Sequence, residues 1–418
     1  MLTMNDAQMP LRQSTNAVAQ EAGLTRQTLY KWARNGAIKV NRDNTGHYIW
    51  DQTALISLKQ HIAAYSSGDA LRNHSRQQTS LRTFSIGNRR YLGSKTRLLP
   101  FIQEVVNNHT VNVTTVADIF AGTGSVADMF SRHGVRITVN DILASNAVVY
   151  SCFFGAQHVR SSRITNWINE MNALRGHCGY VTQNYGDRYF SVKNAMKIDS
   201  AREYIEAQKY ISSREKDILL TSLIYGLDKV ANTVGHYDAY RKVMDSIEPI
   251  HFLLPDYKSN NRTMSARIYQ EDANKLARKL DYNDLIYIDT PYNSRQYGDT
   301  YHVLENIVLW KKPKLYGVSR KAIDRSSTRS LYCTAQAGSA FDDLIQHLNA
   351  RYILVSYNNM AKKGNGRSNA KISDEEMRNI LSKRGKLEIF STPFHAYTTG
   401  KTHLKDHREY LYLVDTEE

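Results

Sequence analysis

The stretch Leu285-Ile286-Tyr287-Ile288-Asp289-Thr290-Pro291-Tyr292 joins a short apolar run to an acidic residue and a proline turn. An apolar run of this length predicts a buried strand of an α/β sheet. Open α/β sheets bind their ligands beyond the carboxyl ends of the strands. The sequence therefore places a carboxylate (Asp289), a stiff turn and an aromatic ring (Tyr292) at a binding edge, an arrangement suited to gripping a planar base by its amino group.

A second stretch carries two glycines: Val116-Ala117-Asp118-Ile119-Phe120-Ala121-Gly122-Thr123-Gly124-Ser125-Val126. It predicts a buried strand, a glycine turn and the start of a helix. Gly122 and Gly124 can adopt positive φ and let a ligand approach the backbone closely. Their spacing is not the G-x-G-x-x-G pattern of dinucleotide sites. This turn is the second candidate binding element.

Acidic residues end the next two predicted strands. Arg136-Ile137-Thr138-Val139-Asn140 leads to Asp141, roughly 20 residues beyond Asp118, where nucleotide-binding α/β folds place an acid for ribose hydroxyls. Arg267-Ile268-Tyr269-Gln270-Glu271 leads to Asp272 in the same manner. Both acids are candidate ligand contacts.

The stretch Tyr91-Leu92-Gly93-Ser94-Lys95 stands ahead of the glycine turn, within a basic segment. An aromatic face attracts a cation, and an ammonium attracts a carboxylate. Tyr91 could thus meet a cationic group of a ligand, and Lys95 could meet a carboxylate. Both are candidate ligand contacts.

Together, these stretches resemble motifs of DNA methyltransferases that modify exocyclic amino groups. The stretch from Asp289 to Tyr292 resembles the D-P-P-Y motif, with Thr290 in place of the first proline. The glycine turn resembles the D-x-F-x-G-x-G loop that holds S-adenosylmethionine. The string Y-x-G-S-K resembles the segment that opens the catalytic domain of Dam-type adenine methylases.

The order of the motifs strengthens the resemblance. From Tyr91 to a late predicted strand, Tyr352-Ile353-Leu354-Val355-Ser356-Tyr357-Asn358, it is the order of the alpha group, and it covers roughly residues 86 to 415. The strings Y-N-S-R-Q-Y after Pro291 and Y-H-x-L-E-N-I from Tyr301 to Ile307 resemble the branch that contains the FokI-associated methylase.

The resemblance implies a Rossmann-like, S-adenosylmethionine-dependent methyltransferase fold of the α/β class over residues 86–418. The cofactor-binding residues it implies are Tyr91, Lys95, Asp118, Phe120, Gly122, Gly124, Asp141 and Asp272, with Asp272 near the cofactor's adenine amino group. The catalytic residues it implies are Asp289, Thr290, Pro291 and Tyr292.

The expected reaction follows from the chemistry of adenine N6, whose lone pair is delocalised into the ring. Asp289 would accept one N–H, the Thr290 carbonyl would accept the other, and Tyr292 would stack on a base flipped out of the duplex. S-adenosylmethionine already carries an activated methyl group, so no metal is expected.

The N-terminal residues 1–65 predict a separate small domain. Ser14–Glu21 and a second helix capped by Thr25 and ending at Arg34 flank a glycine turn, which is a helix-turn-helix pattern. Ile38–Val40 and His47–Trp50, on either side of a polar segment, predict a hairpin wing.

This N-terminal pattern resembles the winged, DNA-binding head of MerR-type regulators. The residues expected to meet DNA in the major groove are Thr25, Arg26, Gln27, Thr28 and Lys31. An oligomerisation or packing module is the alternative. Residues 66–85 are rich in Ser, Asn, Gln and Arg and predict a linker.

Residues 150–262 are expected to form an inserted target-recognition region. Arg214–Val230 predicts a helix with one apolar face, which indicates core packing. In the following Asn232–Lys242 segment, aromatic residues and cations alternate, and the residues expected to touch DNA are His236, Tyr237 and Arg241. A structural turn is the alternative there.

Composition agrees with a polyanionic partner such as double-stranded DNA. The 418 residues include 55 Lys+Arg against 40 Asp+Glu, a net charge of +15. Cys152, Cys178 and Cys333 form no C-x-x-C pair, so reduced cytoplasm is the expected location. Neither a membrane span nor the apolar core of a signal peptide is evident.

Three functions remain open from the sequence. DNA adenine-N6 methylation is favoured, because cytosine-N4 enzymes more often begin the catalytic motif with Ser than with Asp. A DNA-binding regulator whose methyltransferase fold is weakened by Thr290 is the second, and a cytosine-N4 or RNA enzyme is the third. A cognate restriction endonuclease is implied by the resemblance alone. No motif in the sequence specifies the DNA recognition sequence or the oligomeric state.

Overall fold

The computed structural model describes residues 14–22, 24–62, 82–257, 266–358, 370–393 and 408–418. The chain divides into two compact units, Met1–Ser80 and Leu81–Glu418. The expected linker spans this boundary, and its residues 66–81 lie outside the described ones. Within the described part of the chain, no helix has the length and apolar character needed to span a membrane.

The N-terminal unit begins with two short helices, α1 (Thr15–Glu21) and α2 (Arg26–Arg34). The Ser14 side chain accepts the N–H of Ala17 and caps α1. Thr25 Oγ1 accepts the N–H of Thr28 at 3.1 Å, where α2 starts. A hydroxyl at a helix start satisfies a backbone donor that has no partner inside the helix, which explains both boundaries.

A hairpin follows, and its second strand lies within the expected range His47–Trp50, whereas its first strand comes after the expected Ile38–Val40. β1 (Asn41–Arg42) pairs antiparallel with β2 (Tyr48–Ile49). Asp43 Oδ1 accepts the backbone N–H of both Thr45 and His47, and these bonds close a tight turn inside the segment that was expected to be a loop. The buried side chains of the unit are Val18, Ala19, Leu29, Ile38, Trp50, Ala54 and Leu58.

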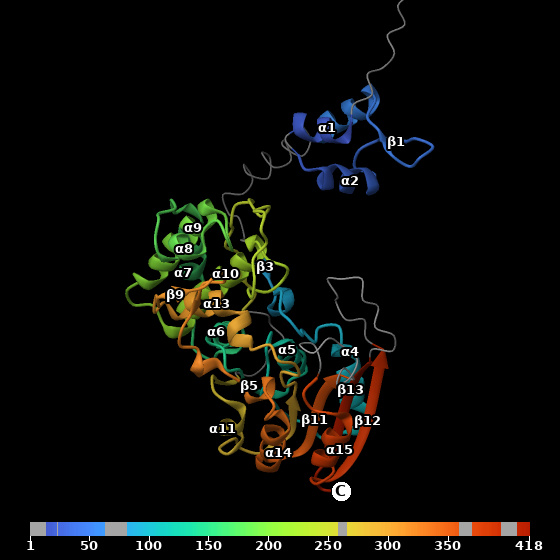
Figure 1. The fold of residues 1–418 in the computed structure, drawn as a ribbon, viewed down its shortest axis with the longest axis vertical. Helices are drawn as coiled ribbons and strands as arrows, with labels where there is room; N and C mark the ends of the chain where they lie inside the picture. The colour runs from blue at the N-terminus through green and yellow to red at the C-terminus, as the bar shows by residue number, and fades with distance from the viewer. Residues whose placement is uncertain (1–13, 23, 63–81, 258–265, 359–369, 394–407) are drawn as a thin grey trace, which may run out of the picture. The chain divides into compact units, whose positions relative to one another are not determined.

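The larger unit is built on a seven-stranded sheet of order β12-β13-β11-β8-β4-β5-β7 (Figure 1). Its parallel strands are β4 (Thr115–Asp118), β5 (Arg136–Asn140), β7 (Arg267–Tyr269), β8 (Asn283–Ile288) and β11 (Ala350–Asn358). β13 (Arg408–Asp415) is antiparallel to β11, and β12 (Lys386–Pro393) is antiparallel to β13. The strand order reverses between β4 and β8, which creates a switch point for ligand binding.

The sheet separates two hydrophobic cores, because successive side chains of a strand point to opposite faces. Leu285 and Tyr287 belong to one core and Ile286 and Ile288 to the other. The helices that contribute to the first core include α4 (Leu99–His109), α5 (Ser125–Arg132) and α6 (Ala144–Phe154). Those that contribute to the second are α11 (Ala273–Ala277), α14 (Ala337–His347) and α15 (Asp374–Leu381). The expected α/β class is confirmed.

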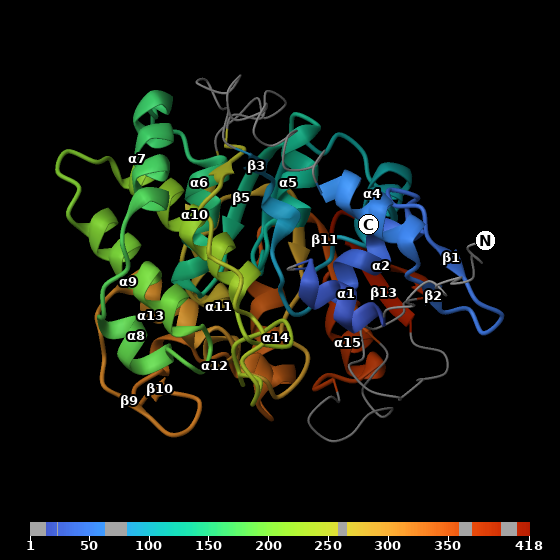
Figure 2. The same cartoon turned by 90° about the horizontal axis from the view of Figure 1, so that it is seen from above.

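The residues between β5 and β7 form a helical layer that continues the first core (Figure 2). It contains α7 (Ser161–Ala173), α8 (Tyr180–Tyr185), α9 (Val192–Glu206) and α10 (Ser213–Val230). The helix α10 is buried on more sides than the single apolar face that was expected. Leu220, Tyr225 and Asp228 on its other sides are buried as well, because α6, α7, α9 and β6 (Leu254–Pro255) all pack against it.

Short elements complete the larger unit. They are β3 (Thr83–Phe84), which pairs with β6, η1 (Ile86–Asn88), α12 (Tyr297–Thr300), α13 (His302–Leu309), β9 (Leu315–Tyr316), β10 (Lys321–Ala322), η2 (Ser326–Thr328) and η3 (Leu331–Cys333).

Candidate active site

A pocket of about 900 Å³, open solvent at its mouth included, lies at the carboxyl ends of the parallel strands. Its walls come from segments that are far apart in the sequence: residues 91–95, the turn after β4, the end of β5, residues 271–273, and the end of β8. All four expected catalytic residues line it. So do the expected cofactor residues Tyr91, Lys95, Asp118, Phe120, Gly122, Asp141 and Asp272.

The backbone of the glycine turn is exposed to the pocket because Gly122 carries no side chain. Gly122 has a φ of +52°, and a Cβ there would lie 3.2 Å from the Tyr91 ring. Its carbonyl accepts the Tyr150 hydroxyl at 2.7 Å. Gly124 (φ +75°) is not among the lining residues. It starts α5, and a Cβ there would meet Ile86 at 2.8 Å, so its small size serves packing.

Asp141 and Asn140 hold the end of β5 against two neighbouring loops. Asp141 Oδ2 accepts the N–H of Gly122 at 3.1 Å, which ties the acid to the glycine turn. Asn140 donates to the carbonyls of Ile119 and Glu271 and accepts the N–H of Glu271. The Asn140 and Asp141 side chains therefore hold the backbone of this pocket wall in place through hydrogen bonds.

Two other predicted cofactor residues flank this wall. Asp272 caps α11 by accepting the N–H of Lys275 at 3.1 Å. The Phe120 ring meets Tyr332 edge-on, with centroids 5.2 Å apart. Tyr332 lines the pocket and was not anticipated, because no local pattern links residue 332 to the glycine turn.

Asp118, at the end of β4, is buried, and its Oδ1 has no hydrogen-bond partner among the described residues. Burial raises the pKa of Asp118 well above its ordinary value, and the nearby charges of Asp289 and Asp141 add to the effect. An unpaired buried oxygen costs free energy, so its presence at a pocket wall indicates a place for a donor from outside the chain.

Lys95 connects the segment Tyr91–Lys95 to the turn that begins at Asp289. Its Nζ lies 2.7 Å from Asp289 Oδ2. The expectation was that this ammonium meets a cofactor carboxylate, but the structure places it on the predicted catalytic acid. Burial alone would lower the pKa of Lys95, but Asp289, Tyr292 and Glu409 together outweigh burial and raise this pKa well above its usual value.

The second oxygen of Asp289 is free. Oδ1 is buried and has no hydrogen-bond partner among the described residues, while Oδ2 is held by Lys95. Burial raises the pKa of Asp289, and Lys95 counteracts part of that rise. The acid thus offers one fixed, unoccupied acceptor in the lining of the pocket.

Thr290 and Tyr292 complete the predicted catalytic turn. Thr290 is buried, and its hydroxyl has no partner among the described residues. The Tyr292 ring packs edge-on against Tyr357, with centroids 5.6 Å apart, and lies 5.3 Å from the Lys95 ammonium. These contacts fix the ring while leaving part of it in the pocket lining.

The string from Tyr301 to Ile307 supports the opposite wall. Tyr301 stacks on Tyr91 at 4.5 Å with rings nearly parallel, and its hydroxyl accepts the N–H of Leu92 at 2.6 Å. The Glu305 carboxylate accepts the N–H groups of Ala144 and Ser145, at the start of α6. These two residues therefore position the Tyr91 segment and the helix after Asp141.

Glu409, in β13, is a buried acid that local reasoning missed. It is 3% exposed, and its Oε2 has no hydrogen-bond partner among the described residues. Burial raises the pKa of Glu409 to about 7, Lys95 lowers it and Asp289 raises it. The Lys95 ammonium is consequently surrounded by more than one acid.

The residues expected to contact DNA differ in how far their side chains are exposed to solvent. Thr25, Arg26 and Gln27 are exposed at the start of α2, and Thr28 is partly exposed. The side chain of Lys31 lies outside the described ones. Arg241 is exposed and pairs with Asp245, and His236 is half-buried.

Tyr237 does not face outward as expected. It is 2% exposed, and its hydroxyl donates to Asp228 of α10 at 2.9 Å. Its ring therefore packs the 232–242 loop from within. In the part of the chain that the structure describes, no group of three or more His, Cys, Asp or Glu side chains is arranged to hold a metal ion.

Comparison with known proteins agrees with this geometry. Residues 91–364 match the family model of the D12 class N6 adenine-specific DNA methyltransferases. Modification methylase StsI of Streptococcus sanguinis is 34% identical over 329 residues, 74% of this chain and 48% of that protein. Type II methyltransferase M.FokI of Planomicrobium okeanokoites is 30% identical over 357 residues, 78% of this chain and 52% of that protein.

A shorter relative aligns over nearly its full length. Type II methyltransferase M.NlaIII of Neisseria lactamica is 29% identical over 351 residues, 78% of this chain and 98% of that protein. The chain spans about half the length of the StsI and FokI relatives. The family match covers more than half of this chain and includes both the glycine turn and the Asp289 turn. The chain therefore belongs to the D12 class of N6 adenine-specific DNA methyltransferases.

Proposed function

We propose that this chain transfers a methyl group from S-adenosylmethionine to N6 of adenine in double-stranded DNA. The observation that carries the proposal is the shared pocket. The glycine turn, Asp141 and the Asp289 turn all line it, although they are distant in the sequence. One cavity can thus hold a methyl donor beside an acceptor base.

The pocket lining fits the methyl donor. When bound, S-adenosylmethionine supplies a methyl group that its sulfonium has already activated. Gly122 leaves the backbone accessible, and the unpaired Asp118 Oδ1 and the Asp141 carboxylate offer acceptors for its polar groups. Asp272 and Phe120 would hold its adenine end, and Tyr91 its sulfonium end.

The Asp289 turn fits the acceptor base. Asp289 Oδ1 is an unoccupied buried acceptor, and it would take one N–H of the adenine amino group. The Thr290 carbonyl would take the other, and Tyr292 would stack on the ring. These contacts localise the lone pair of the amino nitrogen and orient it towards the methyl carbon. The reacting atoms are thereby held in a fixed geometry for attack.

Lys95 serves this turn as a positioning residue. Because it occupies Asp289 Oδ2 at 2.7 Å, it orients the carboxylate so that Oδ1 is the acceptor left for the base. Its positive charge also favours the ionised form of Asp289, which is the form that accepts an N–H.

DNA binding is assigned to two further parts of the chain. We infer that α2 of the N-terminal unit, with Thr25, Arg26, Gln27 and Thr28 at its start, is a recognition helix of a winged helix-turn-helix. Within the larger unit, the region 150–262 would contribute target recognition, with His236 and Arg241. The base must leave the duplex stack to reach the pocket.

We further infer a role in a restriction-modification system with a partner endonuclease, and the relatives named Type II methyltransferases support this inference. The test of the proposed activity is incubation with labelled S-adenosylmethionine and duplex DNA, followed by nucleoside analysis. Label in N6-methyldeoxyadenosine supports the proposal. Label in N4-methyldeoxycytidine, or in no nucleoside, would contradict it.

A further inference from the structure

The segment 311–329, which follows α13, is a hairpin rich in positive charge. β9 and β10 pair antiparallel within it, with Tyr316 opposite Lys321. The segment contains seven cations and one acid, Asp324. Figure 2 shows it, in orange at the labels β9 and β10, projecting at one edge of the larger unit. We call residues 311–329 the cationic hairpin.

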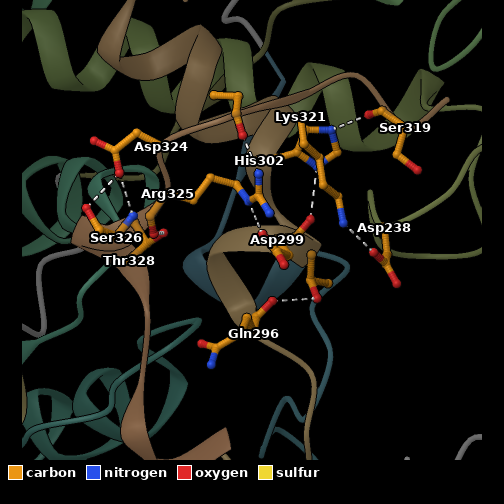
Figure 3. A network of polar contacts seen from close by, with 12 residues as sticks. Asp238, Gln296, Asp299, His302, Ser319, Lys321, Asp324, Arg325, Ser326 and Thr328 are labelled. Atoms are coloured by element: carbon orange, nitrogen blue, oxygen red, sulfur yellow. Dashed lines mark hydrogen bonds and ion pairs between the residues drawn. The ribbon is translucent and has the colours of Figure 1, made fainter. Parts of the chain in front are cut away.

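Several side-chain contacts fix the cationic hairpin to the body, and Figure 3 shows three of them. Lys321 Nζ lies 2.8 Å from Asp238 of the 232–242 loop. Arg325 pairs with Asp299 of α12. His302 of α13 contacts the Ser319 carbonyl through Nε2 at 2.8 Å. The hairpin is therefore held at both of its strands, and its orientation is set by the protein.

The same anchors connect the cationic hairpin to the active-site pocket. Asp299 lies in α12, whose first residue, Tyr297, lines the pocket. Gln296 exchanges two hydrogen bonds with the backbone of Ser330, at 2.9 and 3.0 Å. Thr328 and Ser330 themselves line the pocket. The base of the hairpin is thus part of the pocket wall.

The contact between α12 and the hairpin base is close. A Cβ added at Gly298 would lie 2.0 Å from Thr328 Oγ1. Such an approach is open only to glycine, so the sequence at residue 298 is suited to holding the hairpin at this distance.

Four cations of the hairpin are not used for anchoring. Among the described residues, none of them has an ion-pair partner: Lys311, Lys314, Arg320 and Arg329. Lys312, Lys321 and Arg325, by contrast, pair with Glu203, Asp238 and Asp299. These four positive charges attract anions, so they suit an anionic partner outside the described residues.

Apolar side chains are exposed on the same hairpin. Val318 is 78% exposed, Ile323 71% and Tyr316 44%. Gly317, between Tyr316 and Val318, has a φ of +68° and nothing within 4 Å of a Cβ position, so the tip stands clear of the body. Clustered exposed apolar groups mark interaction sites, and their combination with unpaired cations suits DNA better than a purely apolar partner.

We propose that the cationic hairpin docks on the DNA duplex beside the flipped base, with its four spare cations on phosphates and its tip against base edges in a groove. A two-stranded ribbon fits the major groove, and phosphate contacts set its register. The proposal rests on the proposed methylation of duplex DNA and adds a DNA-contacting element after the catalytic turn, outside the 150–262 region.

The test uses two variants of the full chain, Lys311→Ala with Arg320→Ala, and Val318→Ser. Matched controls are Arg136→Ala and Val111→Ser. Arg136 is exposed at the start of β5, at the sheet edge opposite the pocket, and Val111, 56% exposed, precedes β4 at that same edge. Duplex affinity is measured at several salt concentrations, together with S-adenosylmethionine binding and thermal unfolding.

The double variant should weaken duplex binding and reduce the slope of log affinity against log salt by about two, about one for each lost phosphate contact. Val318→Ser should weaken duplex binding by about tenfold with the slope unchanged. Cofactor binding and unfolding should match the wild type, and both controls should bind DNA normally.

Duplex affinity equal to wild type in both hairpin variants overturns the proposal, including the case in which the hairpin holds a protein partner instead. Failure of the proposed function is distinguishable. It appears in the wild-type chain as absence of methyl transfer to adenine, whereas failure of the hairpin proposal appears only in the variants.

Discussion

The ammonium of Lys95 lies 2.7 Å from Asp289 Oδ2, so the segment Tyr91–Lys95 directly holds the acid of the proposed catalytic turn. This contact occupies one carboxylate oxygen, and the other, Oδ1, is buried in the pocket lining without a hydrogen-bond partner among the described residues. A charged pair in a buried site is costly to form and costly to break. The pair favours the ionised form of Asp289 and fixes its orientation, as the proposed contact with the acceptor base requires.

Lys95→Met should change the pH dependence of methyl transfer. Without the cation, the pKa of Asp289, already raised by burial, rises further. Activity that requires ionised Asp289 should then be low at neutral pH and recover as pH increases. The measurement is kcat against pH, with Lys95→Arg as the variant that keeps the charge. Superimposable profiles for Lys95→Met and wild type would exclude this role.

Thr290→Pro should raise methyl transfer without altering the DNA sequence that is modified. Proline fixes φ in the turn and removes a buried hydroxyl that has no partner among the described residues. Single-turnover rates on a cognate duplex measure the effect, and mapping of modified sites checks specificity. Equal or lower activity in Thr290→Pro would show that threonine does not loosen the turn.

Gly122→Ala should weaken S-adenosylmethionine binding by about tenfold or more, since a side chain at positive φ is strained and would approach the Tyr91 ring at 3.2 Å. Gly87→Ala is the matched control, because nothing lies within 4 Å of a Cβ at that position. Calorimetric titration with the cofactor measures both. Equal affinities in the two variants would remove the glycine turn from the cofactor site.

Glu409→Gln should flatten the pH dependence of stability. The folded pKa of about 7 exceeds the ordinary value of 4.5, so the folded state retains a proton that the unfolded state has lost. The contribution of Glu409 to the free energy of unfolding is therefore greatest below about pH 4.5 and is lost as pH rises through 7, by on the order of 3 kcal/mol.

Denaturant unfolding of wild type and Glu409→Gln at several pH values tests this sign. The difference in free energy of unfolding should shift in favour of Glu409→Gln between pH 5 and pH 8. A difference that stays constant over this range would mean that Glu409 titrates normally in the folded chain.

Strands and turns with local signals could be predicted from the sequence. The strand Arg136–Asn140 has the expected bounds, because its apolar run is short and ends at polar residues. The late strand begins two residues earlier than expected, at Ala350. The expected first residues of α1 and α10 differ from the observed ones by a single residue, and the last residues match.

Contacts between distant segments could not be predicted in the same way. No local pattern signals that Lys95 reaches Asp289, or that Glu409 of the last strand lies near both. The burial of Tyr237 depends on its hydrogen bond to Asp228 of α10, which follows from tertiary packing. The cationic hairpin contains only two short strands, and nothing in its sequence alone places its base in the pocket wall.

The most direct test of the central claim compares wild type with Asp289→Ala in methyl transfer and in cofactor binding. With labelled S-adenosylmethionine and duplex DNA, the wild type should place label on adenine N6. Asp289→Ala should lose this transfer, yet bind S-adenosylmethionine with nearly unchanged affinity. Near-normal turnover by Asp289→Ala, or loss of cofactor binding together with activity, would contradict the assignment of Asp289 to the acceptor base.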